Sequence, residues 1–141
     1  MPTIRSATTT WHGSLTDGSG RVELDSSGLG GFDVTWVSRA NEPAGRTSPE
    51  ELIGAAHSSC FSMALSSALA KAGTPPETLE TQAEVSFQPG EGITGIHLTV
   101  RGTVAGMSAE DFAAAADAAK AGCPVSKALA GTTITLTATL A

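Results

Sequence analysis

Aromatic and basic side chains are scarce in this sequence of 141 residues. It has four Phe, two Trp and no Tyr, and its eight Lys and Arg are outnumbered by fourteen Asp and Glu, which gives a net charge of −6. The basic residues form no run, and the aromatic residues do not alternate with them. A protein that follows a phosphate backbone needs a basic stripe, and a single-strand binder adds stacking aromatics to it. The sequence therefore argues against nucleic acid as a partner.

Cysteine is also scarce, since the chain has only Cys60 and Cys123. The N-terminal residues contain no long apolar run of the kind found in signal peptides, so we expect a cytoplasmic protein. In that compartment two cysteines are less often a permanent disulfide than a redox pair or two buried thiols. A chain of this length buries enough surface to fold as one domain, 1–141, without a disulfide framework. We expect neither a metal nor another cofactor.

Charged residues are missing altogether from residues 52–70. This segment has nearly the length of a membrane span, but it carries His57 and several serines, which disfavour lipid. The preceding SPEE, residues 48–51, has an N-cap serine, a proline at the first helical position and a glutamate three residues after the cap. We therefore predict a long helix that begins here and ends near Gly73. Small and apolar residues lie on all its sides, so we expect it to be central and not to enter a membrane.

Periodicity and turn residues divide the rest of the chain. β-prone runs separated by glycines predict a three-stranded meander before the long helix, and alternating apolar and polar residues predict further strands after it. The predicted strands lie at residues 3–13, 20–26, 31–38, 83–89, 93–104 and 132–140. The predicted helices lie at residues 49–71, 108–120 and 122–131. The resulting order, βββ-α-ββ-αα-β, is an α+β fold.

The two cysteines differ in their surroundings. Cys123 follows a glycine and precedes Pro124, so it is expected near a helix N-terminus, where free amide groups stabilise a thiolate. Cys60 lies in the uncharged segment, where burial alone raises the pKa of a thiol. His57 is either a base for Cys60 or, more often, a core histidine whose hydrogen bonds are satisfied. His57, Cys60 and Cys123 together lack the paired spacing of a structural zinc site. From these features alone, two plain buried thiols remain an equal interpretation.

Two longer motifs resemble one family. SPEELIGAAHSSCFSMAL at residues 48–65 and KAGCPVSKAL at residues 120–129 are similar to the OsmC/Ohr family of peroxide-reducing proteins, and more to its osmotically inducible OsmC branch. The resemblance implies an intertwined homodimer with each active site at the interface and with the two helices that carry the first cysteine in its centre. It also implies that Cys60 is the peroxidatic cysteine and that Cys123 is the resolving one.

The resemblance further implies a catalytic glutamate and an arginine. Glu50 matches the family's catalytic carboxylate. For the arginine that contacts the thiolate we choose Arg39, in WVSRA at the end of the third predicted strand, with Arg21 as the alternative. The guanidinium of Arg39 lowers the pKa of Cys60 in this scheme, and Glu50 orients it through a fork-shaped contact.

The implied reaction is the reduction of a peroxide. The Cys60 thiolate attacks the O–O bond, an alcohol or water leaves, and Cys123 converts the sulfenic acid to a disulfide that an external dithiol reduces. The resemblance points to lipoyl groups on protein partners as that dithiol, and it does not rank organic peroxides against hydrogen peroxide. The rival interpretations are a non-catalytic dimeric module that binds a small molecule, and a redox sensor that signals through the same disulfide.

Helix geometry limits this scheme. In a straight helix Glu50 and Cys60 are separated by about 15 Å of rise, too far for both to touch one guanidinium. We therefore predict either a helix break at Gly54 or a group that reaches in from the partner chain. A substrate with an organic tail also needs an apolar pocket. The candidates for its lining are Phe61, Met63, Met107, Phe112, Leu29 and Trp36.

Overall fold

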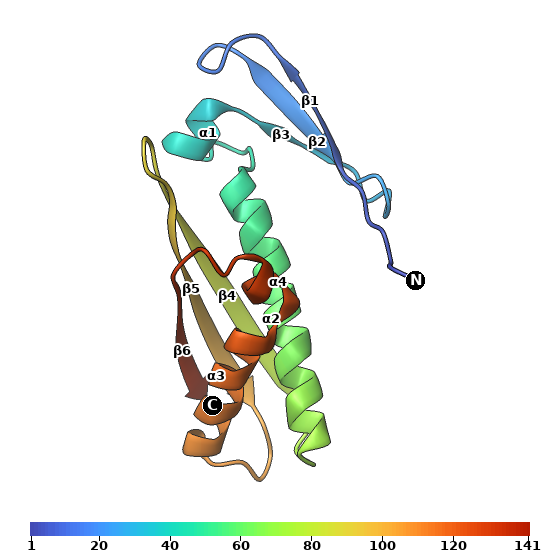
Figure 1. The fold of residues 1–141 in the computed structure, drawn as a ribbon, viewed down its shortest axis with the longest axis vertical. Coiled ribbons are helices and arrows are strands. Elements are labelled where there is room, and N and C mark those ends of the chain that lie inside the picture. The colour runs from blue at the N-terminus through green and yellow to red at the C-terminus, as the bar shows by residue number, and fades with distance from the viewer. The chain divides into compact units, whose positions relative to one another are not determined.

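The computed structural model describes all residues, 1–141, and divides them into two compact units, Met1–Leu52 and Ile53–Ala141. The strands are β1 Thr8–His12, β2 Ser19–Glu23, β3 Gly31–Val34, β4 Thr78–Gln88, β5 Gly92–Thr103 and β6 Ile134–Leu140 (Figure 1). The helices are α1 Trp36–Ala40, α2 Pro49–Lys71, α3 Ala109–Gly122 and α4 Pro124–Ala128. The predicted α+β class and element order are confirmed, with α1 as an addition. The assignment of one domain stays a prediction.

The first unit contains an antiparallel sheet in the order β1-β2-β3. The third predicted strand was extended too far, because the chain leaves β3 after Val34 and forms the short helix α1. The Thr35 hydroxyl accepts a hydrogen bond from the Ser38 amide and the Ser38 hydroxyl accepts one from the Thr35 amide, both at 3.0 Å. This reciprocal capping box fixes the first turn of α1. Arg39 therefore lies on a helix and not at a strand end.

Helix α2 begins as predicted but does not break. Ser48 accepts a hydrogen bond from the Glu51 amide at 3.1 Å, while the Glu51 carboxylate turns to the Thr47 hydroxyl instead of completing a capping box. The helix then runs unbroken to Lys71, so the predicted break at Gly54 is wrong. Gly54 has a different role, since a Cβ there would lie 3.1 Å from the Ala83 carbonyl oxygen of β4. Its missing side chain allows α2 to lie close to the sheet.

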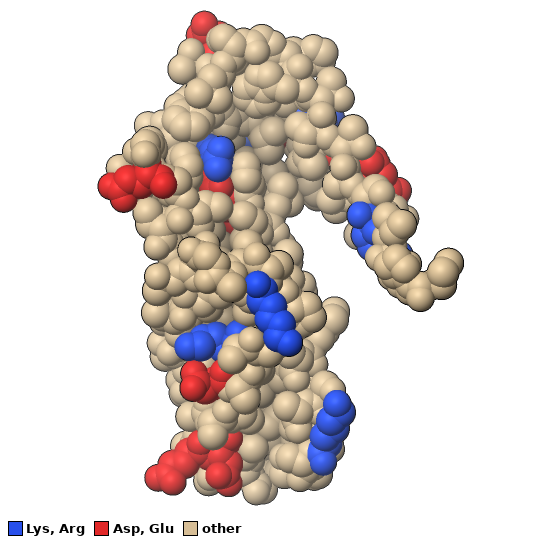
Figure 2. Space-filling model, viewed as in Figure 1, with Lys and Arg blue, Asp and Glu red and all other residues tan.

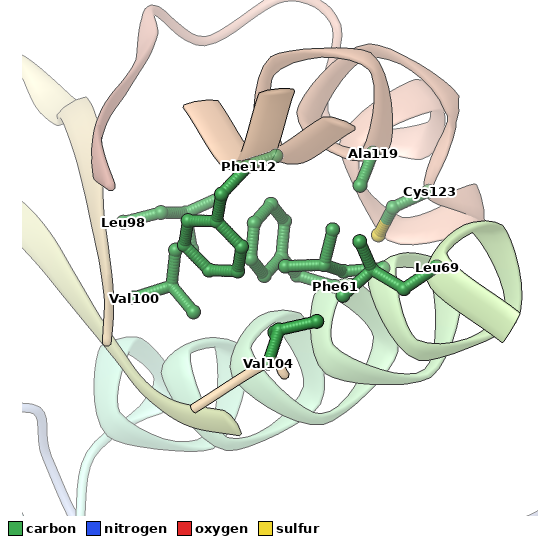
Figure 3. Close-up of a cluster of buried hydrophobic side chains, with 10 residues drawn as sticks. Phe61, Leu69, Leu98, Val100, Val104, Phe112, Ala119 and Cys123 are labelled. Carbon is green, nitrogen blue, oxygen red and sulfur yellow. The ribbon is translucent and has the colours of Figure 1, made fainter. Parts of the chain in front are cut away.

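The second unit places a mixed sheet against three helices. Strand β4 pairs antiparallel with β5, and β5 pairs parallel with β6. The buried side chains of β5 alternate along the strand as expected for a sheet with one covered face. The core is formed by Phe61, Leu65, Leu69, Leu98, Val100, Val104, Phe112, Ala116, Ala119 and Cys123 (Figure 3). It therefore joins α2, β5, α3 and the start of α4.

Only one side of α2 is covered within this unit. Its buried positions, among them Phe61, Leu65 and Leu69, recur at helical spacing, whereas Met63 on the other side is 72% exposed. By length and composition alone α2 is long and apolar enough to cross a membrane, although one side of it forms part of a packed core. The face of the molecule in Figure 2 shows Lys and Arg as separate spots and not as a basic stripe.

Replacement of Gly102 by alanine is expected to destabilise the second unit. The added Cβ would lie 2.5 Å from the ring of the fully buried Phe112 and 3.1 Å from Leu79, so these side chains must shift. Overpacking of this kind costs about 1–3 kcal/mol, measurable as a lower urea midpoint. Gly95 on the same strand is the matched control, because its Cβ would meet only the Thr133 carbonyl oxygen at 3.6 Å. If Gly95→Ala and Gly102→Ala are equally stable, the packing argument is wrong.

Candidate active site

The sulfur atoms of Cys60 and Cys123 lie 3.0 Å apart, although the residues are far apart in sequence. Cys60 is on α2, and Cys123 is at the junction of α3 and α4. Both are free thiols, joined by a hydrogen bond between the sulfurs. A disulfide needs a separation of about 2.0 Å, so a small movement is enough to form one.

Local sequence explains the position of Cys123. Its amide donates to the Ala119 carbonyl at 2.9 Å as the last bond of α3, and Cys123 is itself the N-cap residue of α4, with Pro124 at the first position. The prediction of a helix N-terminus here is confirmed. Cys123 is fully buried at the edge of the core, with its sulfur turned inward (Figure 3), whereas Cys60 is half-buried. A reagent therefore reaches Cys60 more easily than Cys123.

The surroundings act in opposite directions on the two thiols. Burial raises the pKa of Cys60, as does its hydrogen bond with Cys123, with partial offset from a hydrogen bond to the Val125 backbone. Burial also opposes ionisation of Cys123, but interactions with Cys60, with the backbone and side chain of Ser126 and with the Val125 backbone outweigh it and lower its pKa. None of the groups that shift the pKa of Cys60 is a cation. Within this unit alone, the negative charge belongs on Cys123.

His57 contacts Ser126 and not Cys60. Its Nε2 lies 2.7 Å from the Ser126 hydroxyl oxygen, and its Nδ1 is buried without a hydrogen-bond partner. Burial lowers the pKa of His57, so the ring is neutral near neutral pH. The interpretation of His57 as a base for Cys60 is therefore wrong. The interpretation of His57 as a core histidine with satisfied hydrogen bonds is correct for Nε2 but not for Nδ1. Sequence reasoning missed Ser126, whose signal was its place one helical turn after Cys123.

Arg39 and Glu50 form a two-pronged ion pair in the first unit. The Arg39 Nε lies 2.8 Å from Oε1 of Glu50, and a terminal guanidinium nitrogen lies 3.1 Å from Oε2. Glu50 is buried, so this fork contact holds the guanidinium in a fixed orientation. Arg21 instead pairs with Glu23 and Asp33 on the exposed side of the β1-β2-β3 sheet. The predicted contact between Arg39 and Glu50 is thus present, and Arg21 is engaged elsewhere.

An apolar pocket of about 350 Å³ lies beside Arg39 within the first unit. It is lined by Thr9, Trp11, Leu15, Val22, Val34, Thr35, Trp36, Arg39, Pro49 and Leu52. Of the residues predicted to line a substrate pocket, only Trp36 belongs to it. Phe61 of α2 and Phe112 of α3 instead belong to the core of the second unit, where both helices pack with β5. No three His, Cys, Asp or Glu side chains are grouped to hold a metal ion.

Comparisons with known proteins identify a family and a fold for this chain. A family model described as OsmC-like protein matches residues 42–138. The chain is 43% identical over 122 residues to Peroxiredoxin OsmC of Escherichia coli K12, which covers 84% of this chain and 85% of that protein. A solved OsmC-like protein from Mycoplasma pneumoniae has a TM-score of 0.74 at 16% identity, over 99% of both chains. An organic hydroperoxide resistance protein OsmC from Legionella pneumophila has a TM-score of 0.68 at 22% identity, also over 99% of both.

Proposed function

The chain belongs to the OsmC-like protein family, and from this premise we propose that it is a cysteine-based peroxidase. The single observation that carries the proposal is the 3.0 Å approach of two free thiols, one half-buried and one buried. A pair at this separation is suited to a cycle of oxidation to a disulfide and reduction by a dithiol. The name of the Escherichia coli relative agrees with this chemistry.

In the proposed reaction Cys60 is the nucleophile. Its thiolate attacks one oxygen of the peroxide, the O–O bond breaks, and the leaving oxygen takes a proton and departs as an alcohol, or as water from hydrogen peroxide. Cys60 is then a sulfenic acid. The Cys123 thiolate attacks the Cys60 sulfur and expels hydroxide, which becomes water, and a disulfide remains. A dithiol reductant, for which we propose a lipoyl group on a partner protein, restores both thiols.

We assign the activating cation to Arg39. Cys60 needs one, since burial raises its pKa and no cation in its own surroundings opposes the effect. Arg39 is held in a fixed fork by Glu50, and this geometry suits a guanidinium that contacts a thiolate and a peroxide oxygen. Because α2 is unbroken, Glu50 and Cys60 of one chain remain about 15 Å apart along the helix. The pair therefore serves Cys60 of a partner chain in a homodimer.

The exposed side of α2 supports the homodimer. That side carries small and apolar side chains such as Ala55, Ala56 and the exposed Met63, and α2 has no charge between Glu51 and Lys71. An uncharged apolar helix face is suited to packing against a copy of itself.

The apolar pocket next to Arg39 is suited to the organic part of a hydroperoxide. We therefore propose organic hydroperoxides as substrates.

Replacement of Cys123 by serine tests this cycle. We expect Cys60 to be oxidised once by cumene hydroperoxide and to accumulate as a sulfenic acid, because no neighbouring thiol can condense with it. The wild-type protein should instead form an intramolecular disulfide and turn over with a lipoyl or dithiothreitol reductant. Dimedone labelling and mass spectrometry distinguish the two products. A wild-type protein in which peroxide oxidises neither cysteine is not a peroxidase.

A further inference from the structure

His57 and Ser126 take no part in the cycle above, although Ser126 lies one helical turn after Cys123. Ser126, on α4, is 5% exposed, and its Oγ lies 2.7 Å from Nε2 of the fully buried His57 on α2. Against the effect of burial, the pKa of Cys123 is lowered first by Cys60 and then by the backbone and side chain of Ser126. The imidazole therefore contacts a hydroxyl that lies one helical turn from Cys123, whose sulfur is 3.0 Å from that of Cys60.

The unpartnered nitrogen of His57 indicates which atom donates in the hydrogen bond between His57 and Ser126. The ring is neutral near neutral pH and so carries a single N–H. Nδ1 is buried with no partner, and a buried N–H without an acceptor is rarer than a buried acceptor without a donor. The proton therefore belongs on Nε2, which donates to the Ser126 oxygen. With its oxygen accepting from the imidazole, the serine has its own hydrogen free to donate to Cys123.

On the basis of the peroxidase cycle, we propose that Ser126 is a catalytic residue that donates a hydrogen bond to the Cys123 sulfur and stabilises it as a thiolate, and that His57 is the residue that positions Ser126. This relay, His57 to Ser126 to Cys123, acts on the sulfur of the resolving cysteine and not on that of the peroxidatic one. It is built entirely from side chains of the second unit.

Two steps of the cycle depend on this stabilisation. In resolution, a larger thiolate fraction of Cys123 speeds its attack on the Cys60 sulfenic acid. In reduction, one thiolate of the dithiol attacks a sulfur of the disulfide, forms a mixed disulfide with it and expels the other sulfur as a thiolate. The reductant attacks the more accessible Cys60, which then carries the mixed disulfide, and Cys123 is expelled. A stabilised thiolate leaves faster, so a hydrogen bond to Cys123 speeds this step. The second thiol of the reductant then displaces Cys60 and closes the reductant's own disulfide.

The alternative is that the contact only braces α2 against α4, and three variants separate the two. Ser126→Ala removes the hydroxyl, His57→Leu removes the N–H that orients it, and His57→Gln keeps an N–H donor near the position of Nε2. Ser62→Ala is the matched control, because the Ser62 hydroxyl joins α2 to Thr81 of β4 at 2.7 Å without touching either cysteine. Each variant is also compared by its melting temperature.

The first measurement is the ultraviolet absorbance of the Cys123 thiolate against pH, in a Cys60→Ser background. A hydrogen bond to a charged group strongly favours the charged form. At any pH below the pKa of Cys123, the fraction of Cys123 present as thiolate should therefore be about tenfold lower in Ser126→Ala and His57→Leu than in the parent protein. His57→Gln and Ser62→Ala should leave the titration unchanged. An unchanged titration in Ser126→Ala, with a lower melting temperature only, overturns the relay and leaves a structural brace. This readout needs no peroxide, so it stands apart from any failure of the peroxidase function.

The second measurement uses the natural cysteines. After one equivalent of peroxide, Ser126→Ala and His57→Leu should form the sulfenic acid at the wild-type rate but the disulfide about tenfold more slowly. When the oxidised wild-type protein meets 2-mercaptoethanol and is quenched in acid, the mixed disulfide should be found on Cys60. Equal rates of disulfide formation in all variants, or an adduct on Cys123, contradict the proposal. Wild-type protein that peroxide does not oxidise contradicts the peroxidase function instead.

Discussion

Cys60→Ser is expected to lower peroxide turnover by at least about a thousandfold, because a serine hydroxyl is far less ionised and less nucleophilic than a thiol at the same position. The change is nearly isosteric at a half-buried site, so the melting temperature should stay close to that of the wild type. Steady-state consumption of cumene hydroperoxide, tert-butyl hydroperoxide and hydrogen peroxide with a dithiol reductant gives the comparison.

The control for this prediction is Cys123→Ser, which removes the other thiol but leaves the nucleophile. It should lose turnover with a dithiol yet keep the first oxidation step. Turnover that persists in Cys60→Ser removes Cys60 as the peroxidatic residue. Loss of turnover together with a large fall in melting temperature points to a structural role of the thiol instead.

Arg39→Ala is expected to slow the first oxidation of Cys60 by about a hundredfold or more, because in the proposed site the Cys60 thiolate loses its cation and the peroxide loses a donor. Arg39→Lys should recover only part of the rate, since an ammonium cannot form the two-pronged contact that Glu50 makes with the guanidinium. The pH dependence of Cys60 alkylation should move to higher pH in Arg39→Ala. Arg21→Ala is the control, because Arg21 pairs with Glu23 and Asp33 at the surface. If Arg21→Ala slows the oxidation of Cys60 and Arg39→Ala does not, Arg21 is the catalytic arginine.

If the protein forms the proposed homodimer, mixed dimers test whether Arg39 acts within one chain or across two. Arg39→Ala chains retain Cys60, and Cys60→Ser chains retain Arg39. If the residues meet across the interface, each mixed dimer contains one complete site, and random exchange of subunits should restore about a quarter of the wild-type rate. If they meet within one chain, every site in the mixture is incomplete and no rate returns.

Particular residues show how far local sequence determined the fold. The start of α2 is set by the serine, proline and glutamate before residue 52. The covered face of β5 is set by its alternating apolar and polar residues. Both signals come from near neighbours along the chain, so the sequence alone reveals them. The end of the third strand was wrong, because the Thr35 and Ser38 capping box competes locally with strand extension. Gly54 was mistaken for a break, because only the approach of β4 shows that its missing side chain is needed for packing.

By itself the sequence determined the class of the fold, the family, and the identity of the two thiols, because these depend on residue type, spacing and motif. Tertiary structure alone decided that the thiols lie 3.0 Å apart, that Arg39 rather than Arg21 is held by Glu50, and that His57 faces Ser126. The physical reason is that each of these contacts joins separate elements of the chain. Their distances depend on how helices and strands pack, and the periodicity of a single element carries no information about them.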